Sequence, residues 1–280
     1  MVLLGEIKEL TKLRSKDSVK IAELRSKVKV LGKQIRERDA LVLGMVDSLL
    51  TDFINQPEPM TDASKNNLGR KIESRNLFVN VERTLKDNID FLDLTIFSPE
   101  DLLELKKQNQ EFKKVWNKLG PQLTAYYLNK AEKKEELKNI DSLFEEWNIK
   151  INRSVWASIN YHFKNYDIKL LPYNDGNEFT ANILAYVTLE LNKIETASKE
   201  ELIQDYNTFV DSVWSREVSH DWVPMLIENG YLTFDQHDTI EEKLIAWELA
   251  IYDNDLTTIY IVFGVLFLIF AGAIIKRYKK

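Results

Sequence analysis

The chain has 280 residues, of which 44% are hydrophobic and 29% are charged, and its formal net charge is −6. It contains no cysteine, which excludes disulfide bonds, thiol catalysis and cysteine-ligated zinc or iron–sulfur sites. With only nine glycines and six prolines, the composition favours helices over a turn-rich β fold. We therefore predict an all-α protein.

Charge is distributed unevenly along the chain. Residues 1–56 carry 11 basic and 8 acidic side chains, whereas residues 57–275 carry 23 basic and 36 acidic ones. The last five residues, 276–280, add four basic side chains. The composition thus predicts an acidic body between two basic ends.

A seven-residue repeat runs through residues 3–50 without an interrupting proline. Eleven of its fourteen a and d positions are apolar, which is typical of a coiled coil. We expect residues 1–55 to form this coiled-coil helix and to pair with a second copy or with a helix of another protein. An amphipathic helix that folds back on its own body is the alternative. The predicted interface consists of Ile7, Leu10, Ile21, Leu24, Val28, Leu31, Ile35 and Val42.

The same helix is strongly basic. Between Lys8 and Arg38 there are 11 basic residues and four acidic ones. Such a surface is able to bind nucleic acid, anionic lipid or an acidic polymer, although it is also compatible with a solvated coiled-coil exterior. Aromatic residues that would stack on single strands are missing from it, so nucleic acid is not an expected partner.

Residues 56–60 include Pro57 and Pro59 and predict a linker. Beyond them, residues 61–252 predict an acidic bundle of helices. Helix starts are indicated at Thr61 or Ser64, at Ser98 and at Ser198, and helix ends at Gly120-Pro121 and Gly230. A long helix is expected from Gln122 to about Tyr166. The six tryptophans fall at helical core spacings and are interpreted as core residues, although Trp247 could instead approach a membrane surface: Trp116, Trp147, Trp156, Trp214, Trp222 and Trp247.

Residues 256–275 contain no charged side chain. Twenty residues of α-helix rise about 30 Å, the thickness of the hydrocarbon core of a bilayer, so this run predicts a single transmembrane helix. A buried core helix is the alternative. The basic tail, residues 276–280, would hold one end in the headgroup region. The flanking anchor residues are Tyr260, Lys276, Arg277, Lys279 and Lys280.

Basic residues follow the predicted span and acidic residues precede it, which favours a cytoplasmic tail and an extracytoplasmic body. Export of the body would need a signal sequence, and the residues after Met1 do not resemble one. Either an upstream signal is missing, or the chain is a tail-anchored membrane protein with a cytosolic body. Both topologies remain open.

The strongest candidate for chemistry is a group of two histidines and three aspartates: His220, Asp221, Asp235, His237 and Asp238. These residue types bind divalent metals when a fold brings them together, but their spacing matches no metal motif. Capping and solvated surface roles around a helix turn are the favoured interpretation. We therefore predict no metal, no cofactor and no small-molecule substrate.

These patterns favour a non-enzymatic, single-pass membrane scaffold or tether that acts by protein–protein association. The coiled coil and the acidic bundle would supply the association, and the bilayer would be the second partner. Two alternatives are a membrane-bound metal-dependent hydrolase that uses His220 and His237, and an accessory subunit of a larger membrane complex.

Overall fold

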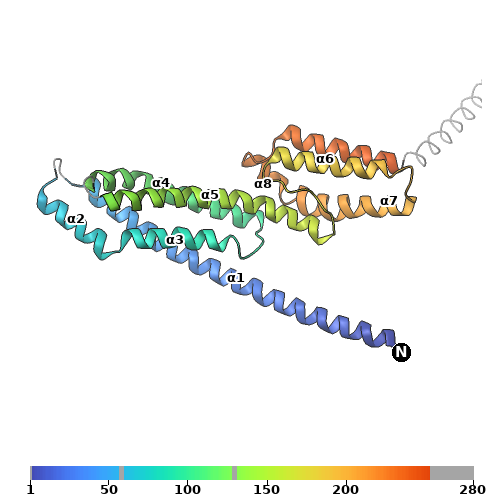
Figure 1. The fold of residues 1–280 in the computed structure, drawn as a ribbon, viewed down its shortest axis with the longest axis horizontal. Helices are drawn as coiled ribbons and strands as arrows, with labels where there is room; N and C mark the ends of the chain where they lie inside the picture. Colours follow the sequence, from blue (N-terminus) through green and yellow to red (C-terminus); the bar gives the residue numbers. More distant parts are fainter. Residues whose placement is uncertain (1, 57–59, 128–130, 253–280) are drawn as a thin grey trace, which may run out of the picture. The chain divides into compact units, whose positions relative to one another are not determined.

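The computed structural model describes residues 2–56, 60–127 and 131–252, and for residues 2–22, 24 and 25 it describes the backbone alone. Within these ranges the chain forms helices and connecting loops, with no β-strand (Figure 1). The predicted all-α class is therefore confirmed for the described residues. The chain divides into two compact units, Met1–Val155 and Trp156–Lys280.

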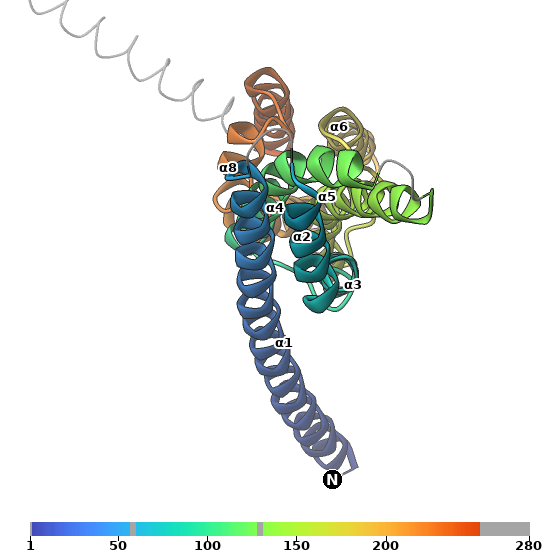
Figure 2. The ribbon, with the colours of Figure 1, turned by 90° about the vertical axis from the view of Figure 1, so that its left-hand side faces the viewer.

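The first unit contains four helices and most of a fifth. Helix α1 passes along α3 and α4 with its C-terminal half, and its N-terminal half extends beyond them (Figures 1 and 2). The helices are α1 (Val2–Ile54), α2 (Asp62–Ser74), α3 (Leu77–Phe91), α4 (Pro99–Tyr126) and α5 (Ala131–Asn165), which continues into the second unit.

The second unit contains the end of α5, a π-helix and further α-helices around an aromatic core. Trp247 packs edge-on against Tyr206 and Phe209, with ring centroids 5.2 and 5.8 Å apart. The elements after α5 are α6 (Gly176–Asn192), α7 (Lys199–Tyr206), the π-helix η1 (Asn207–Ser219), α8 (Val223–Glu228) and a helix over residues 234–252.

Side-chain caps start the helices where the sequence predicts them. The hydroxyl oxygens of Thr61, Ser98 and Ser198 each accept a hydrogen bond, of 3.2 Å, from the backbone N–H three residues later. Each cap satisfies a backbone donor that has no partner within its helix. In the second unit, Gly230 follows α8 and adopts a φ of 72°. This left-handed conformation commonly ends a helix, so the predicted stop at Gly230 is confirmed.

The predicted stop at Gly120-Pro121 is wrong, because α4 continues through both residues to Tyr126. An internal proline removes one backbone hydrogen bond and costs about 3 kcal/mol. Tertiary contacts beyond it offset this cost, since Leu123 is buried and the Tyr126 hydroxyl donates a 2.7 Å hydrogen bond to the Lys65 carbonyl of α2. The predicted helix from Gln122 to Tyr166 is accordingly shorter, and begins at Ala131.

All six tryptophans are buried, which confirms their interpretation as core residues. In the first unit the Trp116 indole N–H donates a 2.9 Å hydrogen bond to Asp141 of α5, which links α4 to α5. Trp247 belongs to the core of the second unit, so the alternative of a membrane-surface position for its side chain is wrong.

Candidate functional site: the two halves of helix α1

The C-terminal half of α1 is docked on its own unit. It packs against α2, α3 and α4. Val46 and Leu49 are completely buried there, and Phe53 meets Tyr126 of α4 edge-to-face at 6.1 Å. This half therefore matches the alternative predicted from the sequence, an amphipathic helix that folds back on its own body.

The stripe that α1 buries differs from the predicted coiled-coil seam. Apart from Leu50 at a b position, its buried side chains occupy the a and e positions of the heptad, whereas the d positions Leu31, Arg38 and Met45 are exposed or half-buried. At 3.6 residues per turn, the a/e and a/d stripes are centred about 50° apart around the helix. Docking therefore uses a stripe next to the predicted seam. The buried a and e side chains are Ile35, Asp39, Val42, Val46, Leu49 and Phe53.

The docked region ends at Gly32. A Cβ atom at this position would lie 2.9 Å from Cζ of Phe91 in α3, so the absence of a side chain lets the two helices approach. Gly32 is also an e position, and the three e positions that directly precede it, Thr11, Ser18 and Arg25, are polar in the sequence. The buried stripe thus loses its apolar character where the contact with α3 ends.

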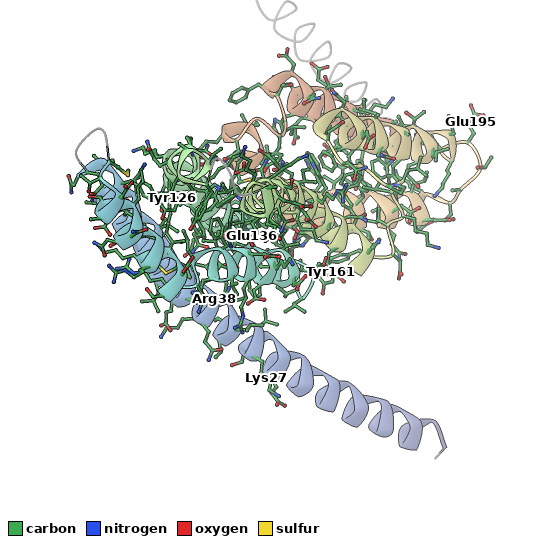
Figure 3. The ribbon with its side chains drawn as sticks, turned by 60° about the vertical axis from the view of Figure 1, so that its left-hand side comes forward. Lys27, Arg38, Tyr126, Glu136, Tyr161 and Glu195 are labelled. Carbon is green, nitrogen blue, oxygen red and sulfur yellow. The ribbon has the colours of Figure 1, made fainter. Side chains whose placement is uncertain are left out.

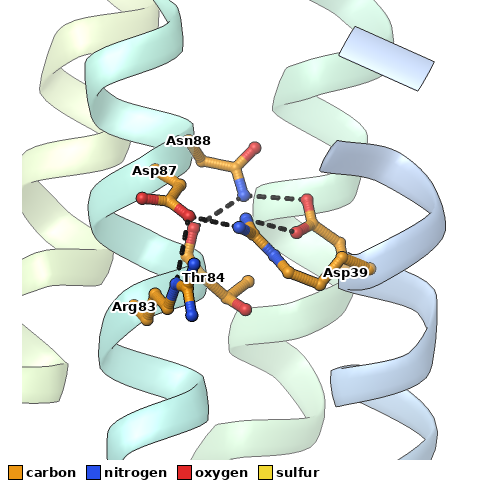
Figure 4. Close-up of polar contacts among 6 residues, drawn as sticks. Asp39, Arg83, Thr84, Asp87 and Asn88 are labelled. Atoms are coloured by element: carbon orange, nitrogen blue, oxygen red, sulfur yellow. Dashed lines mark hydrogen bonds and ion pairs between the residues drawn. The ribbon is translucent and has the colours of Figure 1, made fainter. Parts of the chain in front are cut away.

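A polar cluster lies within the docked interface (Figure 4). The Asn88 side-chain amide of α3 donates a 2.8 Å hydrogen bond to Asp39 of α1 and a 2.9 Å hydrogen bond to the backbone carbonyl of Thr84. The Arg38 guanidinium pairs with Asp87 of α3 and lies 3.4 Å from Asp39. The cluster therefore joins α1 to α3 at one defined register.

Asp39 is the titratable group in this cluster with a clearly perturbed pKa. Burial raises the pKa of its carboxyl from 3.8 to about 6, against the opposing effects of the Asn88 hydrogen bond and the Arg38 charge. Desolvation therefore outweighs the favourable partners. At neutral pH, desolvation of the ionised Asp39 carboxylate makes docking of α1 less favourable, and protonation removes this desolvation cost.

The described side chains of α1 just before Gly32 are largely exposed. Between Glu23 and Leu31, the described side chains are exposed except for that of Val28, which is half-buried. Val30 is 55% exposed and Leu31 is 38% exposed. Figure 3 shows Lys27 on this projecting part, whereas Arg38 lies where α1 meets α3. We call residues 2–31 the free half of α1.

The predicted interface residues therefore fall into three groups. Ile35 and Val42 are buried within the chain's own unit. Val28 and Leu31 lie at the start of the free half, half-buried and exposed respectively. Ile7, Leu10, Ile21 and Leu24 lie in the helical backbone of the free half. Pairing through the free half stays a prediction.

The three histidines pack with neighbouring aromatic and acidic side chains. His162 accepts a 3.3 Å hydrogen bond from the Trp222 indole, and its Nδ1 lies 3.2 Å from Glu217. His237 stacks on Trp214 with its Nε2 3.3 Å from Glu241.

The exposed His220 pairs with its neighbour Asp221 at 2.6 Å. Among the described residues, no group of three or more histidine and acidic side chains is arranged to hold a metal ion. The candidate group of His220, Asp221, Asp235, His237 and Asp238 is therefore not assembled as a metal site.

The acidity of the body belongs to the second unit alone. Residues 57–155 carry 17 basic and 17 acidic side chains, whereas residues 156–252 carry 6 basic and 17 acidic ones. The sequence contains this difference, but it becomes visible only once the boundary between the units is known. The helix over residues 234–252 combines acidic and apolar groups on one exposed face, at Asp238, Glu242, Ile245 and Leu249.

The predicted membrane span, residues 256–275, and its flanking residues Tyr260, Lys276, Arg277, Lys279 and Lys280 lie outside the described residues. Among the helices that are described, none is both long and apolar enough to cross a bilayer. Comparisons with models of known protein families, with curated proteins and with solved structures found no match.

Proposed function

We propose that this chain is a non-enzymatic, single-pass membrane scaffold or tether that works by binding other proteins. The observation that carries the proposal is that one half of α1 is docked on its own unit while the helix of the other half extends beyond α3 and α4. A helix that projects from its own unit with apolar residues at heptad spacing is suited to bind another helix. Its buried C-terminal half fixes it to the rest of the chain.

The membrane part of the proposal rests on the sequence of residues 256–280. Twenty uncharged residues followed by four basic residues within a five-residue tail are typical of a transmembrane helix and its cytoplasmic flank. With the free half of α1 near one terminus and the span near the other, the chain would hold a bound partner close to a bilayer. A cytoplasmic tail with an extracytoplasmic body and a tail-anchored arrangement are both compatible with this role.

The alternative of a metal-dependent hydrolase has no specific observation in its favour. His237 is stacked against Trp214, and His220 pairs with its sequence neighbour Asp221. An accessory subunit of a larger complex differs from a scaffold only in the identity of the partners, so the same surface would serve it.

Deletion of residues 2–31, the whole free half, tests association through α1. The deletion leaves Gly32 and the buried a and e positions in place, so the docked half remains intact. We expect the full chain in non-ionic detergent to form a concentration-dependent complex that the deletion weakens, as measured by sedimentation equilibrium. Equal masses for the two proteins at every concentration would contradict association through the free half. Circular dichroism of the shortened chain checks that its remaining helices are retained.

A further inference from the structure

The free half of α1 presents basic and apolar side chains together. Where α1 leaves its unit, Lys29, Val30 and Lys33 are exposed and share one face of the helix, because Lys29 and Lys33 are four residues apart and Val30 and Lys33 three. The carboxylates near them are few. Glu23 lies 2.7 Å from Lys27, and Glu37 lies 3.7 Å from Lys33. A partner for this surface needs acidic groups around apolar ones.

The helix over residues 234–252 has that character. Its exposed positions Asp238, Glu242, Ile245 and Leu249 are spaced by four, three and four residues, so they share one face. Ile245 is 53% exposed and Leu249 is 50% exposed, although the opposite face of the helix is buried in its own unit. The helix also lies in the unit that carries the excess acidic charge.

We infer that the partner of the free half of α1 is a second copy of this chain, which binds it on the exposed acidic face of the helix over residues 234–252. This inference rests on the proposed function, which assigns protein association to the free half. Lys29 and Lys33 would face carboxylates, and Val30 would cover Ile245 and Leu249. Each copy offers both surfaces, so the contact joins unlike surfaces in a head-to-tail manner.

Charge makes this contact more favourable than pairing between two α1 helices. Residues 8–38 carry 11 basic and four acidic side chains, so two such helices side by side would repel each other. Residues 235–248 carry five acidic side chains and one basic. Salt screens both attraction and repulsion. Added salt should therefore weaken the contact between α1 and the acidic helix, and it should strengthen pairing between two α1 helices.

Sedimentation equilibrium of the full chain in non-ionic detergent at several salt concentrations tests the inference. Between about 0.02 and 0.5 M salt the Debye length falls from about 20 to about 4 Å. We expect self-association that weakens as salt is added. Association that strengthens with salt would point to pairing between α1 helices, which overturns this inference and leaves the proposed function intact. A monomer at every concentration and salt would also overturn this inference, and it would leave a different protein as the partner in the proposed function.

Charge reversal identifies the two surfaces. We expect Lys29→Glu and Lys33→Glu together to weaken association about tenfold, since exposed charge pairs each contribute a few tenths to 1 kcal/mol and reversal turns attraction into repulsion. The double variant Asp238→Lys and Glu242→Lys should do the same, and a mixture of the two variants should associate again.

The matched control reverses two exposed lysines of α4 at the same spacing, Lys114→Glu and Lys118→Glu, and should leave association unchanged. No recovery in the mixture, or an equal loss in the control, would overturn the inference. Binding of the free half to anionic phosphatidylserine vesicles, with no effect of the Asp238→Lys and Glu242→Lys variant on self-association, would assign it to a membrane surface instead.

Discussion

Replacement of Asp39 by asparagine removes a buried charge while preserving its main hydrogen bond. The asparagine carbonyl can still accept the hydrogen bond from Asn88, which is 2.8 Å in the native chain. Because burial raises the pKa of Asp39 from 3.8 to about 6, its folded state binds a proton more tightly than the unfolded chain does. The contribution of Asp39 to the free energy of unfolding is therefore fully present below about pH 4 and is lost as the pH rises through about 6.

The magnitude follows from the size of this shift. A change of about two pKa units corresponds to about 3 kcal/mol, at 1.4 kcal/mol per unit. We expect the Asp39→Asn variant and the native chain to be almost equally stable at pH 4. At pH 7.5 the variant should be more stable by up to about 3 kcal/mol.

The assay is urea unfolding of the detergent-solubilised chain at several pH values. Amide hydrogen exchange of α3 is the suitable readout, because the two units need not unfold together. The exposed Asp47 on the same helix provides a control, and Asp47→Asn should shift the free energy of unfolding by no more than about 0.5 kcal/mol. If the native and Asp39→Asn curves run parallel from pH 4 to pH 7.5, the argument from burial is refuted.

Two glycines of α1 should respond in opposite directions to alanine. Gly32→Ala places a Cβ 2.9 Å from Phe91 and should destabilise docking by about 1–3 kcal/mol, whereas Gly44→Ala has open space and should stabilise the helix by about 0.5–1 kcal/mol. Thermal unfolding of both variants checks this, and stabilisation by Gly32→Ala would contradict the close approach. In the second unit, Gly176→Ala drives a Cβ into the backbone carbonyl of Tyr231 and should cost about 1–3 kcal/mol. Hydrogen exchange of α6 measures this loss, with Gly120→Ala in an uncrowded part of α4 as the control. Ser98→Ala removes the cap of α4 and should cost about 1 kcal/mol in urea unfolding, and an unchanged midpoint would argue against that cap.

Local signals predicted the parts of the fold that depend on neighbouring residues. The hydroxyls of Thr61, Ser98 and Ser198 satisfy backbone donors within their own first turns, so their positions are readable from the sequence. The tryptophans were equally predictable, because their spacing places them on the buried faces of helices.

The sequence could not predict features that depend on distant contacts. Pro121 is a strong local stop, yet α4 passes through it because Leu123 and Tyr126 find partners beyond it. The heptad pattern predicted that the a and d residues of α1 would be buried together. The docked half instead buries mainly its a and e residues, because apolar spacing alone does not show which stripe of the helix meets its own unit. The only sequence signal for that stripe was its apolar e positions, Val46 and Phe53.

The candidate site shows the same division. By sequence alone Gly32 is a weak helix former, and only the position of Phe91 reveals its packing role. Asp39 lies at an e position, where a charged residue is expected on a solvated flank, and its burial beside Asn88 requires the tertiary structure. The concentration of acidic charge in residues 156–252 was present in the sequence, but the unit boundary was needed to find it.

The central claim, that a membrane-spanning helix anchors this scaffold, is tested most directly by alkaline carbonate extraction of membranes from cells that produce the full chain. The account predicts that the chain stays in the membrane pellet. A Val265→Arg and Ile269→Arg variant should move to the supernatant, since each arginine costs about 2.5–3.5 kcal/mol at the centre of a span. The control variant, Val265→Leu and Ile269→Leu, should remain in the pellet. Release of the unmodified chain into the supernatant would contradict the anchor.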